Sequence, residues 1–320
     1  MDQWIASTSQ FFSYYPKYEF LDNVLSLTGR KRLNLYIDVK GCAQALFQEW
    51  AVRHILDHSK NSRVIDTSLF SAVLEFIAFH KTYARKRQID LNMYFFMESG
   101  KSSYHLDIYK EYKAQRGLSD MFGLDLASRE LFYQILDRNY AAIYKVVNKL
   151  PNCNFIKLEF LEADFIPWHL MKHVLKKEDV DSAANVIYST DKDMLQCLDA
   201  TNVFQFCRHH KSIKMLTYKD IYSHWLKVDL DINDPASWFP MALSIIGDTG
   251  DGFKGVNGVG PVKIVKVFEY VMTLCGHSMT NVYENIANKK PIFNGEYQVK
   301  DPALKLILKD QDIVVRNLKL

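Results

Sequence analysis

The sequence lacks the features that mark several classes of protein. No apolar run approaches the roughly 18–20 residues that a membrane span requires, so we expect no membrane association. The five cysteines are scattered and form no CxxC pair, which predicts reduced thiols rather than a disulfide framework or a zinc site. The glycine-rich stretch 247–260 has no GK[ST], which excludes a nucleotide-binding P-loop.

Excess charge of either sign is also absent. The 320 residues include 40 Lys+Arg and 37 Asp+Glu, a formal net charge of +3. This balance argues against a polycationic protein that wraps nucleic acid. Apolar residues make up 48% and charged residues 24%, as in ordinary globular chains. The first thirty residues are aromatic but lack a basic start followed by an apolar block, so they are not a secretory signal. We expect them to pack on the main domain, with a docking segment as the alternative.

Short apolar runs alternate with helical patterns over the first two thirds of the chain. Helices are predicted at 42–58 and 68–87, and strands at 33–38, 91–96, 155–158, 185–188 and 203–206. Strands of this length separated by helices predict an α/β fold, a mostly parallel central sheet covered by helices. From about residue 216 the pattern is mainly helical, with a loop at 288–301 and a final helix that starts at Pro302. We therefore predict an α/β core at 1–215, with 1–30 as an N-terminal extension, and a helical part at 216–320.

Carboxylates follow or end four of the predicted strands. They are Asp38, Glu98, the pair Glu162 and Asp164, and the pair Asp191 and Asp193. Ligands of open α/β sheets bind at the carboxyl ends of the strands. A further pair, Asp248 and Asp251, would share one face of a helical turn. So many converging carboxylates would repel one another, and hard divalent cations with oxygen ligands would neutralise them. Two such ions could clamp the attacking and the leaving oxygens when a phosphodiester is hydrolysed.

The alternative for any single acid is a loop residue or a helix cap. Asp191 and Asp193, for example, could simply cap the helix that follows. Five segments that each carry acids are harder to explain by capping, so the pattern favours a metal site.

The glycine-rich stretch lies between two predicted helices. Gly255, Gly258 and Gly260 allow close approach of a ligand to the backbone, and Pro261 suits the first position of a helix. The free N–H groups of that helix form an anion site, and Lys254, Lys263 and Lys266 add positive charge. This hairpin suits a grip on a nucleic-acid backbone, while a plain tight turn remains an equal alternative on spacing alone.

A basic and aromatic segment follows Glu98. Its cations are Lys101, Lys110, Lys113 and Arg116, and its aromatics include Tyr104, Tyr109 and Tyr112. The last three cations would lie along one face of a helix. Such cations would attract phosphates and stabilise transition-state charge, and the aromatics could stack on an unpaired base. A solvated charged helix is the alternative interpretation.

These motifs together resemble the 5′ nuclease (flap endonuclease) superfamily, in particular its phage ribonuclease H / 5′–3′ exonuclease branch. The resemblance extends over about 33–290. Its most specific elements are STDKDMLQ at 189–196 and GDTGD at 247–251, followed by GVNGVG at 255–260. YKAQR at 112–116 is similar to the basic motif of the family's helical arch, and EAD at 162–164 to its acidic motif.

The resemblance implies a PIN-like nuclease core with a helical arch at about 99–125 and a helix–three-turn–helix element at about 245–275. It implies two Mg²⁺ ions, with Mn²⁺ as a substitute. The first cluster would be Asp38, Glu98, Glu162 and Asp164, and the second Asp191, Asp193, Asp248 and Asp251. Lys113 and Arg116 would engage the scissile phosphate. Lys101, Tyr104, Lys110 and the stretch from Lys254 to Lys266 would contact nucleic acid, with K⁺ at the helix–three-turn–helix.

Two positions depart from the family pattern. Glu98 stands where relatives usually have Asp, so the charge survives on a side chain that is longer by one methylene. Phe165 stands where bacterial and phage relatives often have another Asp. Other branches of the family lack an acid there, so this departure is not read as disabling.

The resemblance therefore implies a structure-specific 5′ nuclease, a 5′–3′ exonuclease or flap endonuclease with ribonuclease H activity. Its substrates would be duplex DNA or RNA–DNA with a 5′ end or flap, in replication or repair. We expect a monomer in a bacterial or phage-infected cytoplasm, or another reducing compartment, with a polymerase, clamp or single-strand-binding protein as partners. The rivals are a PIN-type single-strand endoribonuclease and a non-catalytic protein that protects flaps.

Overall fold

The structure is a computed structural model that describes residues 18–41, 62–99, 103–113, 126–209, 212–228, 230, 232–293 and 300–320. The chain divides into two compact units. Unit 1 comprises residues 1–101 and 120–217, and unit 2 comprises 102–119 and 218–320. The predicted helix at 42–58 lies outside the described residues, as do Lys101 and Arg116. Within the described part of the chain, every helix is too short or too polar to cross a membrane.

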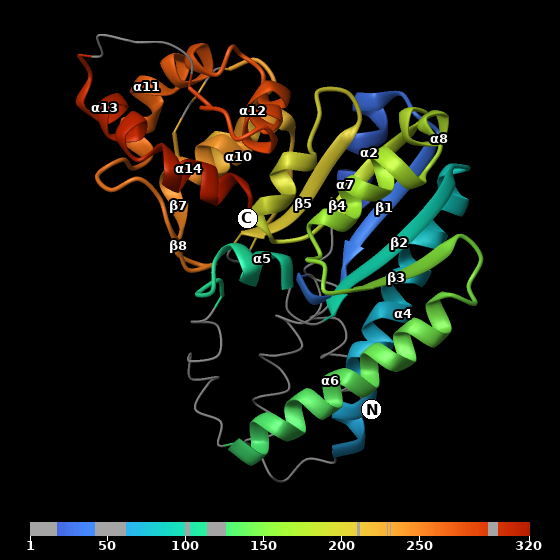
Figure 1. The fold of residues 1–320 in the computed structure, drawn as a ribbon. Coiled ribbons are helices and arrows are strands. Elements are labelled where there is room, and N and C mark those ends of the chain that lie inside the picture. Colours follow the sequence, from blue (N-terminus) through green and yellow to red (C-terminus); the bar gives the residue numbers. More distant parts are fainter. Residues whose placement is uncertain are drawn as a thin grey trace. The chain divides into compact units, whose positions relative to one another are not determined.

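Unit 1 is built on a six-stranded sheet (Figure 1). Its strands are β1 (Arg32–Asp38), β2 (Asp90–Ser99), β3 (Cys153–Glu159), β4 (Ala183–Tyr188), β5 (Val203–His209) and β6 (Ser212–Leu216). They are ordered β3-β2-β1-β4-β5-β6, and only the β5–β6 pair is antiparallel. This confirms the mostly parallel sheet. The sequence patterns missed β6, and they placed Glu98 just after a strand that in fact extends to Ser99.

Helices cover both faces of this sheet (Figure 1). They are α2 (Tyr18–Thr28), α4 (Ser62–Arg87), α6 (Leu126–Val147), α7 (Phe165–His169) and α8 (Lys177–Asp181), with the short elements η3 (Leu170–Val174) and η4 (Lys192–Cys197). The main core lies between α2, α4, α6 and one sheet face, to which β1 contributes Leu33, Leu35 and Ile37. Leu21 and Val24 place α2 in this core, so the described part of the aromatic N-terminus packs on the sheet.

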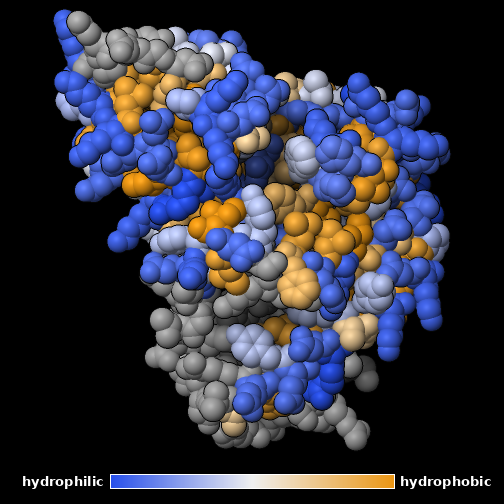
Figure 2. All heavy atoms as spheres, in the orientation of Figure 1, coloured by the Kyte–Doolittle hydropathy of each residue, from blue (hydrophilic) through white to orange (hydrophobic). Residues whose placement is uncertain are grey.

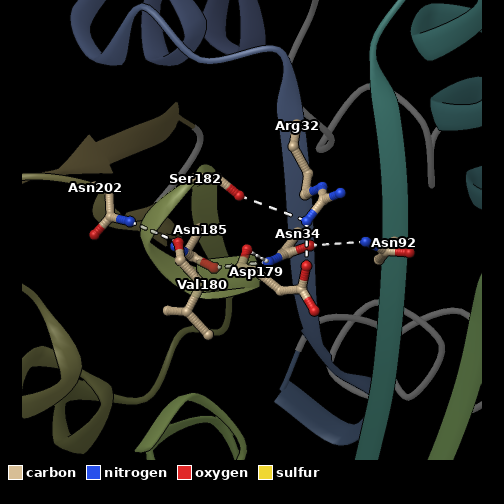
Figure 3. A network of polar contacts seen from close by, with 8 residues as sticks. All are labelled: Arg32, Asn34, Asn92, Asp179, Val180, Ser182, Asn185 and Asn202. Atoms are coloured by element: carbon tan, nitrogen blue, oxygen red, sulfur yellow. Dashed lines mark hydrogen bonds and ion pairs between the residues drawn. The ribbon is translucent and has the colours of Figure 1, made fainter. Parts of the chain in front are cut away.

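Buried amides tie the other sheet face to α8 (Figure 3). Asn34 on β1 donates to the Oδ1 of Asn185 on β4, at 3.0 Å, and accepts from Asn92 on β2, at 3.0 Å. The Asn185 amide also donates to the carbonyl of Val180 at 2.9 Å, and that carbonyl accepts from Asn202 at 2.8 Å. Because buried polar groups are costly without partners, this network holds the end of α8 against the strands.

Replacing Asn185 by leucine should reduce the free energy of unfolding by about 3 kcal/mol. The volume is nearly kept, but the Asn34 amide, the Tyr36 hydroxyl and the Val180 carbonyl each lose a bond in a buried environment. Urea denaturation measures the loss. Asn92→Leu is the matched control, since Asn92 is half-buried and makes one bond to Asn34, and it should cost about 1 kcal/mol. Equal losses in the two variants would contradict a cooperative network.

Unit 2 is mainly helical. Its elements are α5 (Ser103–Ile108), η5 (Tyr218–Asp220), α9 (Ile221–Trp225), α10 (Pro235–Ile246), β7 (Gly247–Asp248), β8 (Phe253–Lys254), α11 (Pro261–Leu274), α12 (Met279–Ala287), α13 (Pro302–Lys309) and α14 (Gln311–Leu318). Pro261 and Pro302 each begin a helix, as predicted. The final segment is two helices rather than one, because the chain leaves the helical conformation at Asp310.

Candidate metal and nucleic-acid site

Asp38 is the most deeply placed acid of the sheet edge. It ends β1, and only 5% of the residue is exposed. Its Oδ1 accepts from the amide of Gly41 at 2.9 Å, and its Oδ2 accepts from the hydroxyl of Ser189 at 2.9 Å. Burial is the main cause that raises the pKa of Asp38 to about 6. The two hydrogen bonds oppose this rise, and the neighbouring carboxylates of Asp191 and Glu98 add to it. A bound cation would stabilise the ionised form of this carboxyl.

Glu98 lies on β2 and Asp191 follows β4, the two strands that pair with β1. In the register of the sheet Asp38 pairs with Phe96, so Glu98 extends two residues beyond it on β2. The Lys40 ammonium lies 3.4 Å from the Glu98 carboxylate. Asp191 is exposed and caps η4, accepting from the amide of Asp193 at 3.0 Å. The capping role weighed for Asp191 is therefore real, and its carboxylate retains further lone pairs for a metal.

The EAD segment follows the neighbouring strand β3. Glu162 is buried at 9% exposure, and Asp164 precedes α7. Burial raises the pKa of the Cys197 thiol to about 12, with the Asp164 carboxylate as a second cause, which places Asp164 close to the end of η4. Six of the eight predicted metal ligands are thus at the carboxyl edge of one sheet, on β3, β2, β1 and β4 or the residues that follow them.

Exposed apolar side chains surround the EAD segment. Phe160, Phe165 and Trp168 are 60%, 42% and 42% exposed. Apolar patches interrupt the polar surface in the view of Figure 2. Phe165, which departs from the family pattern, therefore adds a solvent-facing ring directly after Asp164 and no charge.

Asp248 and Asp251 lie in unit 2 on the β7–β8 hairpin, residues 247–254. The helical turn that the three-residue spacing suggested is wrong, because Gly247 and Asp248 pair with Lys254 and Phe253 in a β-hairpin. Both carboxylates are nonetheless shielded, at 8% and 5% exposure. Asp248 Oδ1 accepts from the amide of Gly250 at 2.8 Å, which shapes the turn.

The described part of the basic segment, residues 103–113, is called here the arch segment. Its helix ends at Ile108, so the predicted helical face with Lys110 and Lys113 is wrong. Lys113 has a φ of 52° and donates its amide to the carbonyl of Asp251 at 2.9 Å. The Lys113 amide therefore bonds to the hairpin rather than to a carbonyl of a preceding helical turn. Tyr104 and Lys110 are exposed, as expected for residues that contact a ligand.

Asp251 also bonds the arch segment through its side chain. The Tyr112 hydroxyl donates to Asp251 Oδ2 at 3.0 Å, and the Lys113 ammonium lies 3.8 Å from the same oxygen. Tyr112 is buried and packs on His105, with ring centroids 4.8 Å apart. The sequence pattern predicts a stacking role for Tyr112 and does not indicate its hydrogen bond to Asp251.

The second part of the glycine-rich stretch, residues 255–260, leads into α11. Gly260 is its N-cap and Pro261 its first residue. Lys263 is exposed, and its ammonium donates to the carbonyl of Gly258 at 2.7 Å. Lys254 and Lys266 are exposed as well. Gly255 has no space for a side chain, because a Cβ there would lie 2.2 Å from the backbone of Ile246. The helix N-terminus and its lysines form a surface suited to phosphate.

Comparison with known proteins places this chain in a family. Residues 43–225, more than half of the chain, match the family described as 5′–3′ exonuclease, N-terminal resolvase-like domain. A 5′–3′ exonuclease of Mycoplasma genitalium is 30% identical over 103 residues, and this match spans 32% of each protein.

Two solved structures from bacteriophage T5 share the fold. A flap endonuclease in complex with DNA and metal ions aligns with a TM-score of 0.57 at 19% identity, over 90% of this chain and 88% of its own. A 5′-exonuclease with bound zinc aligns with a TM-score of 0.56 at 18% identity, over the same shares. At these identities the likeness concerns the fold. With the family match over residues 43–225, the chain belongs to the 5′–3′ exonuclease family.

Proposed function

We propose that this protein is a metal-dependent, structure-specific 5′ nuclease that hydrolyses phosphodiesters near the 5′ ends of duplex DNA or RNA–DNA. The observation that carries the proposal is the buried Asp38, whose pKa is raised to about 6 at a sheet edge shared with Glu98 and Asp191. A buried carboxyl group with a raised pKa, close to other carboxylates, is a typical feature of a functional site. Family membership and the acids after β3 and β4 support the same conclusion.

The donor set fits hard divalent cations, of which we propose two Mg²⁺. Carboxylate oxygens are the ligands that Mg²⁺ prefers. Asp38, Glu98, Glu162 and Asp164 would hold one ion, and Asp191, Asp193, Asp248 and Asp251 the other. When bound, such ions supply a nucleophilic hydroxide and neutralise charge on the phosphate. The metal ions bound in the T5 structures support the dependence on divalent metal, and the choice of ligands follows from the motifs of this sequence.

The chain's own cations would bind and orient the substrate. Lys113 lies beside a predicted metal ligand, so its ammonium is well placed to contact the scissile phosphate, with Arg116 as its proposed companion. The N-terminus of α11, with Lys254, Lys263 and Lys266, would hold the duplex backbone, with K⁺ at its glycine turn. The T5 complex with DNA supports this use of the fold. Removal of replication primers or repair flaps, with replication proteins as partners, would follow from that specificity.

Cleavage assays on three labelled substrates test the proposal. A 5′ flap, a nicked duplex and a single-stranded RNA are each incubated with Mg²⁺ and with chelator. We expect 5′-phosphate products from the flap or nicked duplex with Mg²⁺ only. Cleavage confined to single-stranded RNA would instead identify a PIN-type endoribonuclease, and tight flap binding without cleavage a protective protein.

A further inference from the structure

Arg316, a residue of the C-terminal helix α14, contacts two segments of unit 2 that are remote in sequence. Its guanidinium carbon lies 4.9 Å from the centre of the Tyr109 ring, in the arch segment. Its Nη2 donates to the carbonyl of Lys254, in the β7–β8 hairpin, at 3.1 Å. One planar side chain therefore joins the arch segment to the hairpin that carries Asp248 and Asp251.

Neighbouring groups hold Arg316 in place. Its Nη2 and Nε donate to the side-chain oxygen of Asn317 at 2.7 and 3.0 Å. Asn317 is buried, and its amide donates to the carbonyls of Ser244 at 2.8 Å and Lys254 at 3.0 Å. These bonds anchor α14 to the end of α10 and to the hairpin. The guanidinium is thus oriented before any substrate arrives, as a positioning group must be.

The C-terminal end of the arch segment also bonds to the β7–β8 hairpin. There the Tyr112 hydroxyl and the Lys113 amide bond the side chain and the carbonyl of Asp251. Gly252 approaches the carbonyl of Glu111, which an added Cβ would meet at 3.5 Å. The stretch from Tyr109 to Lys113 is therefore held at its first residue by Arg316 and at its last two by Asp251.

We infer that Arg316 is a positioning residue. It fixes the stretch from Tyr109 to Lys113 on the β7–β8 hairpin and so places the Lys113 ammonium for the reaction. The inference rests on the proposed function for the role of Lys113. Without the contact to Tyr109, this stretch would lose its attachment to α14 at its first residue, while Asp251 would still hold its last two residues. Misplacement of a group by about 1 Å can reduce a rate by about 100-fold, so the loss of this attachment should have a measurable effect.

Three variants of the full chain test the inference: Arg316→Leu, Arg316→Lys and Tyr109→Leu. Kinetics on a 5′ flap at saturating Mg²⁺ should show kcat reduced about tenfold in Arg316→Leu, with KM and its salt dependence unchanged. Arg316→Lys should recover part of kcat, because an ammonium can still lie over the Tyr109 ring. Tyr109→Leu removes the same contact without altering α14 and should match Arg316→Leu. Lys319→Leu, an exposed cation at the end of α14, is the control and should behave as wild type.

Limited trypsin digestion without metal or DNA gives a second readout. Cleavage after Lys110 and Lys113 should be several-fold faster in Arg316→Leu and Tyr109→Leu than in wild type and Lys319→Leu. A higher KM with a weaker salt dependence would overturn the inference and make Arg316 a phosphate contact. Wild-type digestion and kinetics in both leucine variants would overturn it as well. If wild type cleaves no substrate, the proposed function fails, and digestion alone decides whether Arg316 holds the segment.

Discussion

Replacing Asp248 by asparagine or alanine is expected to reduce metal-dependent cleavage of a 5′ flap by about 1000-fold or more, with the fold preserved. Asparagine keeps an oxygen for the Gly250 amide and so retains the turn, while it removes the charge that a divalent cation requires. Alanine also loses that hydrogen bond, at about 1 kcal/mol. Asp191→Ala should have the same effect on cleavage, because Asp191 is proposed to ligate the same ion.

Single-turnover kinetics with Mg²⁺, together with flap binding in Ca²⁺ or chelator, separate chemistry from affinity. Binding should remain close to wild type in all three variants, since the phosphate contacts come from other residues. Glu284→Ala, which removes an exposed carboxylate of α12 in the same unit, is the matched control and should cleave normally. Full activity in Asp248→Asn and Asp191→Ala would eliminate the metal assignment.

Replacing Asp38 by asparagine is expected to stabilise the metal-free protein while it abolishes activity. The pKa of Asp38 is about 6 in the folded protein against 3.8 for the free side chain, so the folded state binds more protons between these values. Stability is therefore lost as the pH rises from about 4 to 6, by up to about 3 kcal/mol, and remains lost above that window. Asparagine carries no charge and escapes this penalty.

Urea denaturation with chelator at pH 4 and at pH 7.5 measures the effect. Asp38→Asn should match wild type at pH 4 and exceed it by up to about 3 kcal/mol at pH 7.5. His80, buried with its pKa lowered to about 4, makes stability rise with pH in both proteins and cancels in the comparison. Asp181→Asn, in an exposed position on α8, should show no such gain. A variant less stable than wild type at pH 7.5 would contradict the burial penalty.

Bound Mg²⁺ is expected to reverse the order of stability of wild type and Asp38→Asn. Mg²⁺ should stabilise wild type and not Asp38→Asn, because ligand binding to the native state alone adds stability. Since the metal must displace the Asp38 proton, its affinity for wild type should fall about tenfold per pH unit below about 6.

The sequence predicted the strands and the acids that lie at or after their ends because both are local signals. Apolar runs of strand length identified β1 to β5, and the glycine turn before Pro261 identified the start of α11. The antiparallel β6 was missed, as was the long helix α6. The helix expected through Lys113 failed because the Lys113 amide bonds the carbonyl of Asp251, a residue far along the chain, instead of the preceding turn.

By itself the sequence determined the fold class, the family resemblance and the set of carboxylates, because periodicity and motif spacing are properties of neighbouring residues. Only the tertiary structure decided how those groups behave. The proton affinity of Asp38 depends on its burial and on Glu98 and Asp191, which lie on β2 and after β4. Arg316 belongs to no motif, and its contact with Tyr109 arises because folding brings the C-terminal helix against the arch segment. Desolvation and long-range contacts are set by neighbours in space, which no local pattern encodes.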